Sequence, residues 1–194
     1  MTQLSKSYMD DFKNREKDAE YINDYTDLAE EILLKGDNES ATRLIKKAEE
    51  VCETFDDYRD LADYLASEEE DEFNDKEWAL LLFKKANKLA STFEHYYDLS
   101  NSLLSSEILE NKDWPTDLIK KAEEICETFD EHLQLAEIIS DKWYLNDKEW
   151  GKKIYYKSLD LASKEETEEI ADSIDEYIDD KNWINEMKNK IKSK

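Results

Sequence analysis

AEEVCETFD, residues 48–56, returns 74 residues later as AEEICETFD, residues 122–130. A second block, NDKEW at residues 74–78, returns unchanged 72 residues later at residues 146–150. Ala86 and Ser158 take the place of the first alanine in the other two units, so the basic period is about 36 residues. Periods of this length are typical of stacked helical arrays, in which each unit buries its apolar face against its neighbours. The repeat therefore predicts an all-α chain.

The composition agrees with an ordered helical protein. Two glycines and one proline in 194 residues leave little material for β-turns. Charged residues make up 40%, but aromatic and aliphatic residues recur throughout at helical spacing, which favours a folded chain over a disordered one. No stretch approaches the roughly 18 apolar residues of a membrane helix, and the first residues lack a signal-peptide core. We therefore expect no membrane span and a cytoplasmic location.

Each repeat unit contains two predicted helices. The first carries an aromatic residue, then Leu and a small residue, then an aliphatic one, as in residues 25–32. The second carries a small residue, a large one four later and another small one, as in residues 41–48. Both patterns place apolar residues on one helix face. We predict a right-handed α-solenoid of at least nine helices and no sheet, with a capping helix in 1–23 and five units at about 24–55, 56–93, 94–129, 130–164 and 165–194.

Helix starts are marked by short acceptor side chains. Thr54 with Asp57, Thr128 with Glu131, and Ser163 with Glu166 have capping-box spacing. The acidic run at residues 67–72 predicts a solvated loop, since it lacks the glycine and alternate spacing of an EF-hand calcium loop. Aspartates are predicted to open the second helices, where they satisfy free amides: Asp37, Asp75, Asp113 and Asp147.

The cysteines and histidines indicate packing rather than chemistry. Cys52 and Cys126 each follow the repeat alanine by four residues, where other units carry Ala90 and Ala162, so a small-residue site explains them. Equivalent positions two repeats apart lie roughly 20 Å from each other in such an array, too far for a disulfide. His132 takes the place of a repeat tyrosine and has no second ligand pair at metal spacing. Since the sequence also has no Cys/His, Ser/His/Asp or phosphate-loop constellation, we predict no metal, no cofactor and no enzymatic activity.

The spacing resembles the tetratricopeptide repeat, whose signature runs W-x2-L-G-x2-Y…A-x3-F…P. Residues 24–55 match it without a gap, and the resemblance extends with inserted loops over about 24–194. Ala or Ser replaces the signature glycine, the final proline is missing, and Trp78 and Trp150 precede the small residue of the second helix. The resemblance implies a scaffold that binds peptides or proteins in a concave groove lined by the first helix of each unit.

Charge is divided unequally between the two sets of helices. The predicted first helices contain 27 acidic residues and a single base, Arg59, counted over residues 24–34, 56–70, 94–107, 130–141 and 165–180. The predicted second helices contain 16 acids and 18 bases, counted over residues 37–53, 75–91, 113–127, 147–163 and 181–194. Solubility alone would not require this one-sided placement, and crowded like charges destabilise a fold. If the first helices line the groove, as the resemblance implies, the groove is acidic. Its partner-binding residues are then Glu30, Asp56, Asp63, Glu94, Asp130, Glu137, Glu165, Glu168, Asp172 and Asp175, with Tyr97 and Leu133 between them.

These features give two hypotheses for function. In the first, the acidic groove binds a basic, nucleic-acid-handling partner and covers its cationic site, as an inhibitor, an immunity protein against a nuclease toxin or a phage protein against a defence nuclease would. Such a surface would act as a DNA mimic. In the second, a neutral scaffold recruits a peptide through Tyr96, Tyr97 and Trp side chains, and the charge is incidental. Direct nucleic-acid binding is not expected, because phosphates need a basic surface. The Asn-, Lys- and Ile-rich usage, with three arginines, is compatible with an AT-rich bacterial or phage genome.

Overall fold

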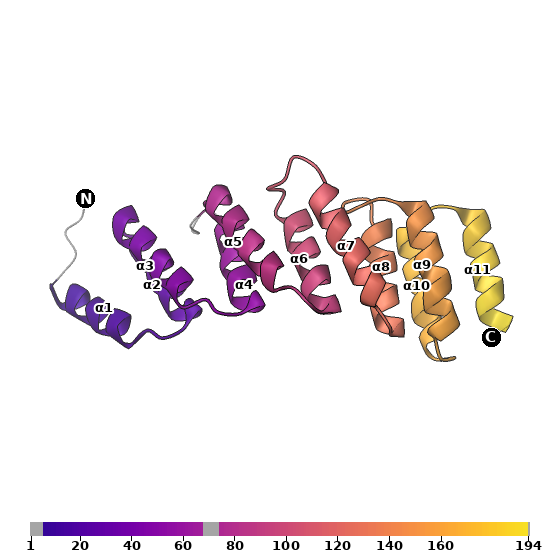
Figure 1. Ribbon diagram of the computed structural model, residues 1–194, viewed down its shortest axis with the longest axis horizontal. Helices are drawn as coiled ribbons and strands as arrows, with labels where there is room; N and C mark the ends of the chain where they lie inside the picture. Colours follow the sequence, from indigo (N-terminus) through magenta and orange to yellow (C-terminus); the bar gives the residue numbers. More distant parts are fainter. Residues whose placement is uncertain (1–5, 68–73, 194) are drawn as a thin grey trace. The chain divides into compact units, whose positions relative to one another are not determined.

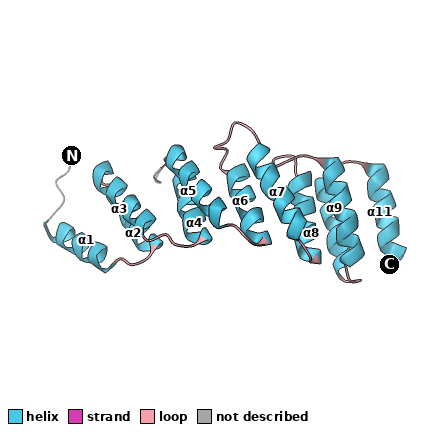
Figure 2. Cartoon of the chain, in the orientation of Figure 1, coloured by secondary structure: helices cyan, strands magenta, loops and turns pink. Residues whose placement is uncertain are grey.

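The computed structural model describes residues 6–67 and 74–193, and its regular structure is entirely helical. Within these ranges there are eleven helices and no strand, which confirms the prediction of an all-α protein (Figure 1; Figure 2). None of these helices combines the length and apolarity that a membrane crossing requires. Most of the predicted acidic loop, residues 68–72, lies outside the described residues. The helices are α1 (Lys6–Asp18), α2 (Ile22–Leu33), α3 (Asn38–Glu50), α4 (Phe55–Ala66), α5 (Lys76–Leu89), α6 (Phe93–Ser105), α7 (Asp113–Ile125), α8 (Phe129–Ser140), α9 (Lys148–Leu161), α10 (Glu166–Tyr177) and α11 (Lys181–Ser193).

Consecutive helices pack as pairs, and the chain divides into two compact units. Unit 1, Met1–Ala90, contains α1 and the pairs α2–α3 and α4–α5. Unit 2, Ser91–Lys194, contains the pairs α6–α7, α8–α9 and α10–α11. In unit 2, α8 contacts both α6 and α10, so the first helices of its pairs form one layer. Packing of each helix against its neighbour in the chain is what a helical repeat requires.

Local caps set where the helices begin. Thr54 and Thr128 form capping boxes, so α4 and α8 begin at the phenylalanine that follows, one residue before the predicted unit starts. Helix α2 begins at Ile22, inside the segment predicted as the capping region 1–23. The predicted aspartate caps are confirmed for three second helices, in which the carboxylate accepts the backbone N–H of the third helical residue: Asp37, Asp75 and Asp147.

Asp113 differs from the other aspartates. The residue before α7 is Lys112, and Asp113 is already the first residue of the helix, so its prediction as a cap is wrong. The reason is local: the side-chain oxygen of Asn111 lies 3.0 Å from the Asp113 amide and accepts its hydrogen. Asp113 still places negative charge in the first turn, where the helix dipole favours it.

Small residues allow the two helices of a pair to approach closely. Ala41, Ala79 and Gly151 are buried at equivalent positions in α3, α5 and α9. The approach is tightest at Gly151, where an added Cβ would lie 1.9 Å from Ser140 Oγ and 3.3 Å from the Ala136 carbonyl oxygen. The position is therefore restricted to glycine by the packing of α9 against α8.

In both units, one glutamate, one tryptophan and one lysine join neighbouring helix pairs. Glu49 in α3 accepts a hydrogen bond from Trp78 Nε1 at 2.7 Å and pairs with Lys85 Nζ at 2.6 Å, both from α5. We refer to this set as an indole–carboxylate clasp. It binds the second helix of one pair to the second helix of the next. Unit 2 has an equivalent clasp between α7 and α9, at 2.8 and 2.7 Å, made by Glu123, Trp150 and Lys157.

Candidate interaction surface

The predicted groove residues lie on both units. Glu30, Asp56 and Asp63 belong to α2 and α4 of unit 1. The others lie on the first-helix layer of unit 2, or directly before α10: Glu94, Tyr97, Asp130, Leu133, Glu137, Glu165, Glu168, Asp172 and Asp175.

In unit 1 the acidic residues of α4 are partly balanced by Arg59. Its guanidinium lies 3.3 Å from a carboxylate oxygen of Asp56 and 2.8 Å from one of Asp60. Glu30 and Asp63 are half-buried, whereas Asp56 is exposed. Unit 1 therefore presents less unbalanced negative charge than its sequence alone indicates.

In unit 2 the first-helix layer is acidic throughout. The helices α6, α8 and α10 contain no lysine or arginine. Glu168, Asp172 and Glu176 are exposed and recur every four residues, so they form a single stripe along α10. Sequence reasoning predicted the first two members of this stripe and missed the third.

Part of this acidity has a structural cause. Glu94, Asp130 and Glu168 lie in the first turns of α6, α8 and α10. Negative charge is favoured there by the helix dipole, by about 0.3–1 kcal/mol for each residue. Asp172 lies further along α10 and gains little from that effect. Glu176 lies in the last turn, where the dipole favours cations instead.

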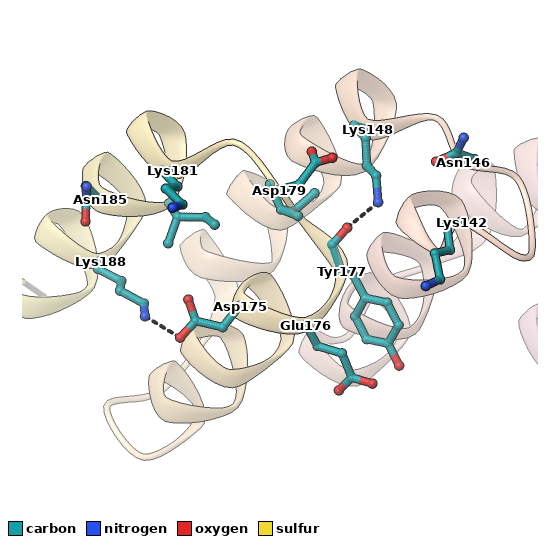
Figure 3. Close-up of a pocket in the computed structure, with 12 residues that line it drawn as sticks. Lys142, Asn146, Lys148, Asp175, Glu176, Tyr177, Asp179, Lys181, Asn185 and Lys188 are labelled. Carbon is teal, nitrogen blue, oxygen red and sulfur yellow. Dashed lines mark hydrogen bonds and ion pairs between the residues drawn. The ribbon is translucent and has the colours of Figure 1, made fainter.

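Two predicted residues are less accessible in the folded unit than the sequence alone indicates. Leu133 is 9% exposed and belongs to the core of unit 2, because α8 packs between α6 and α10. Asp175 is exposed, but Lys188 of α11 binds its carboxylate (Figure 3). Helix packing thus buries Leu133, whereas Asp175 stays on the surface as a paired carboxylate.

Glu137 is the centre of a partly buried polar network that joins three helices. Tyr155 OH in α9 lies 2.7 Å from Ser173 Oγ in α10, and Ser173 in turn hydrogen-bonds Glu137 in α8. An ionised carboxylate only accepts hydrogen bonds. Ser173 therefore donates to Glu137, and Tyr155 donates to Ser173.

This network holds negative charge in a poorly solvated place. Burial raises the pKa of Glu137, and the neighbouring carboxylates of Glu176 and Glu169 raise it further, against the hydrogen bond from Ser173. Burial and the Glu137 carboxylate raise the pKa of Tyr97 to about 12, and the same causes raise the pKa of Tyr177. Among the described residues, no lysine or arginine forms an ion pair with Glu137. The network would therefore be stabilised by an added cation.

The structure also brings together a cysteine and a histidine, which corrects the prediction that no Cys/His constellation exists. Cys126 Sγ lies 3.3 Å from His132 Nε2, and His132 Nδ1 lies 2.8 Å from the Thr128 carbonyl oxygen. Because a carbonyl only accepts, Nδ1 carries the proton, and the thiol has two acceptors within reach, Nε2 of His132 and the Glu123 carbonyl oxygen, each 3.3 Å from Sγ. Burial raises the pKa of Cys126, so the thiol keeps its proton, unlike an activated nucleophile. The pair links the end of α7 to the start of α8.

Two cavities that share Lys142, Lys148, Glu176 and Tyr177 in their linings lie beside the end of α10, and Figure 3 shows the larger one. The larger, of about 650 Å³, extends to α11, and two of its lysines are engaged within the chain. Lys148 Nζ donates to the carbonyl oxygens of Ser140, at 2.7 Å, and Tyr177, while Lys188 binds Asp175. Lys148 thereby places positive charge at the carboxyl ends of α8 and α10, where the helix dipoles favour it. The smaller cavity, of about 290 Å³, is lined by Asp141, Lys142, Trp143, Lys148, Glu176 and Tyr177.

Sequence reasoning did not predict this second cavity. Trp143 lies in the link between α8 and α9, outside the repeat pattern that marked the helices. Tyr177 ends α10, at a position where the repeat has no signature residue. The usable signal was the density of acidic residues on α10, which continues to Glu176.

Comparison with family models, curated proteins and solved structures found no match to this chain. In the parts of the chain that the structure describes, no group of three or more His, Cys, Asp or Glu side chains is placed to hold a metal ion.

Proposed function

We propose that the chain is a right-handed α-solenoid of about five tetratricopeptide-like repeats that acts in the cytoplasm as a binding module for a basic protein. In its most specific form, it is an inhibitor or immunity-type protein that covers the cationic site of a nucleic-acid-handling partner, such as a nuclease toxin or a defence nuclease. One observation carries the proposal. The first-helix layer of unit 2 has acids on all three helices and no lysine or arginine.

The acids that helix formation does not explain are the most informative. Asp172 and Glu176 lie beyond the first turn of α10, and Glu137 is half-buried beside other carboxylates. Crowded like charges reduce the stability of a fold. A basic partner removes this repulsion on binding, which gives the placement a function that solubility does not.

The proposal predicts the kinetics of binding. Complementary charge acts mainly on the association rate, which falls steeply as salt screens the two surfaces. A partner of this chain should therefore carry a basic patch, associate quickly at low salt and associate more slowly as salt is added.

The direct test is a pull-down from the native host at about 0.02 M and about 0.3 M NaCl. It is repeated with Glu168→Lys combined with Asp172→Lys, two exposed residues of α10. The reversal should abolish capture of the basic partner. Lys84→Glu with Lys153→Glu, on exposed parts of α5 and α9, is the control and should preserve capture. An acidic partner, or capture that is indifferent to both salt and the reversal, would exclude the proposal.

The alternative, a neutral scaffold that uses groove aromatics, has less support. Tyr97 is half-buried and stacks on Phe93, with 5.8 Å between ring centroids. The ammonium of Lys121 lies 5.4 Å from the centroid of the Tyr96 ring. Contacts within the chain therefore occupy the Tyr96 and Tyr97 rings, two of the aromatic side chains that this hypothesis assigns to a peptide.

A further inference from the structure

The link between α8 and α9 presents a tryptophan to solvent. Trp143 is 76% exposed, the largest exposure among the large apolar side chains of the described residues. Tryptophan is enriched among the few residues that dominate binding energies at protein interfaces. The exposed indole of Trp143 is therefore a candidate contact for a partner protein.

The backbone around Trp143 is held by bonds from several directions. Asp141 Oδ1 accepts the Trp143 amide hydrogen at 2.7 Å, and the Asp141 carbonyl accepts from the amides of Tyr144, at 3.2 Å, and Asn146, at 3.0 Å. Lys112 Nζ, from the start of α7, donates to the carbonyl oxygens of Trp143 and Tyr144. The indole is therefore displayed from a fixed backbone, so little further ordering is needed when a partner binds.

The cavity of about 290 Å³ beside this tryptophan, which we refer to as the recess, combines aromatic rings with carboxylates. Tyr177 lies beside Glu176 (Figure 3), and the Glu176 carboxylate contributes to the raised pKa of the Tyr177 hydroxyl. Asp141 and Glu176 supply negative charge. The exposed acidic stripe of α10 ends here, because Glu176 is its last member. A basic segment drawn along the stripe would arrive at the recess.

Two lysines also line the recess, and they differ in what they bind. Lys148 is committed to the carbonyl oxygens of Ser140 and Tyr177. Lys142 is exposed, and its ammonium lies 5.0 Å from the centroid of the Trp143 indole. A cation over an indole face is a favourable contact. Lys142 thus occupies, from within the chain, the position that an incoming cation would take.

We propose that the recess receives one lysine or arginine side chain of the basic partner, with its charged end over the Trp143 indole in place of the Lys142 ammonium and its aliphatic stem against Tyr177, where Asp141 and Glu176 supply negative charge. The inference rests on the proposed function and names the contact by which the basic partner is held. It also predicts that Lys142 weakens binding of the partner, whereas the aromatic residues strengthen it. Removing this lysine should help binding, because it competes with the ligand.

The test uses the whole chain and two defined probes, fluorescein-labelled ten-residue oligolysine and oligoglutamate, followed by fluorescence anisotropy at about 0.02 M NaCl. Trp143→Ala should weaken oligolysine binding about tenfold, and Trp143→Phe should retain most of it. Tyr21→Ala is the matched control, since Tyr21 is 72% exposed but belongs to unit 1. Lys142→Gln should bind oligolysine more tightly than Lys153→Gln, which removes the same charge outside the recess. Circular dichroism of each variant verifies that the helices are retained.

The outcomes separate the recess from the wider proposal. If the Glu168→Lys and Asp172→Lys pair weakens oligolysine binding but Trp143→Ala does not, the recess proposal is excluded and the acidic-surface proposal is retained. If Trp143→Ala weakens oligolysine binding but the charge reversal does not, the acidic-surface proposal is excluded and the recess proposal is retained. Tighter binding of oligoglutamate, or loss of self-association in Trp143→Ala on sedimentation, overturns the recess by showing that it holds an anion or a second copy. No oligolysine binding at low salt overturns both.

Discussion

At the scale of single residues, the tightest contact described is the one between α8 and α9. Gly151 faces Ser140, whose buried hydroxyl has no hydrogen-bond partner within the described chain. The sequence predicted a small residue at this position from the repeat. It could not predict that glycine is required, because that depends on which side chain the neighbouring helix places opposite.

Gly151→Ala should lower the free energy of unfolding by about 1–3 kcal/mol, because its Cβ would overlap Ser140 Oγ. Adding Ser140→Ala should recover part of the loss, since it removes the hydroxyl and leaves a contact of 3.2 Å to Ser140 Cβ. Urea unfolding of the two single variants and the double variant measures the coupling. Additive effects of the two changes would show that the overlap is relieved elsewhere.

Glu137 should lower stability at neutral pH. Burial raises its pKa, so the folded chain holds the carboxyl proton more tightly than the unfolded chain. The unfolding free energy contributed by this residue therefore rises as pH falls from the raised pKa towards the ordinary value of 4.5. Glu137→Gln keeps an acceptor for Ser173 and removes the charge.

We therefore expect Glu137→Gln to stabilise the protein by about 1 kcal/mol near pH 7, the size of a single polar contact. The gain should shrink as pH is lowered. The control is Glu127→Gln, which removes the same charge from an exposed residue and should have little effect. Thermal unfolding of the two variants over a pH series measures these effects. A Glu137→Gln protein less stable than the wild type near pH 7 would contradict the claim that the Glu137 charge lowers stability.

At the scale of helices, the clasps show what the sequence could and could not predict. Helix starts were largely predictable, because a capping bond joins residues a few positions apart. Trp78 and Trp150 were recognised as departures from the repeat signature, but their carboxylate partners lie 29 and 27 residues away and required the packed structure. Trp143 was missed for a related reason: no local pattern records the exposure of a side chain in a link.

Glu123→Gln should destabilise unit 2 by about 1–2 kcal/mol, because the ion pair with Lys157 is lost and the bond to Trp150 becomes neutral. The neighbouring residue provides the control. Glu124 is exposed on the same turn of α7, so Glu124→Gln makes the same charge change away from the clasp and should be near neutral. Equal effects of the two substitutions, measured by urea unfolding, would show that the clasp adds nothing beyond net charge.

At the scale of the whole molecule, the net charge of −24 governs the response to salt. Screening weakens repulsion among the many exposed acids, and it also weakens the few ion pairs such as the clasps. Acidic residues outnumber basic ones by 51 to 27, so relief of repulsion should dominate.

Raising NaCl from about 0.02 M to about 0.3 M should therefore increase the free energy of unfolding. The increase should be smaller for Glu168→Lys with Asp172→Lys, since that protein starts with less negative charge on α10. Urea unfolding at several salt concentrations gives the comparison. A wild-type protein destabilised by salt would mean that ion pairs, rather than repulsion, dominate its electrostatics.

The clasps also provide a fluorescence probe for the unfolding of each unit. Each unit holds one indole bonded to a carboxylate, and unfolding transfers that indole to water, which should shift its fluorescence emission to longer wavelength. The two fluorophores occupy equivalent positions in the repeat, and each donates its indole N–H to a glutamate. A chain that retains Trp78 or Trp150 as its only tryptophan would report the opening of one unit at a time, and the pair of spectra would reveal whether the units melt together or in sequence.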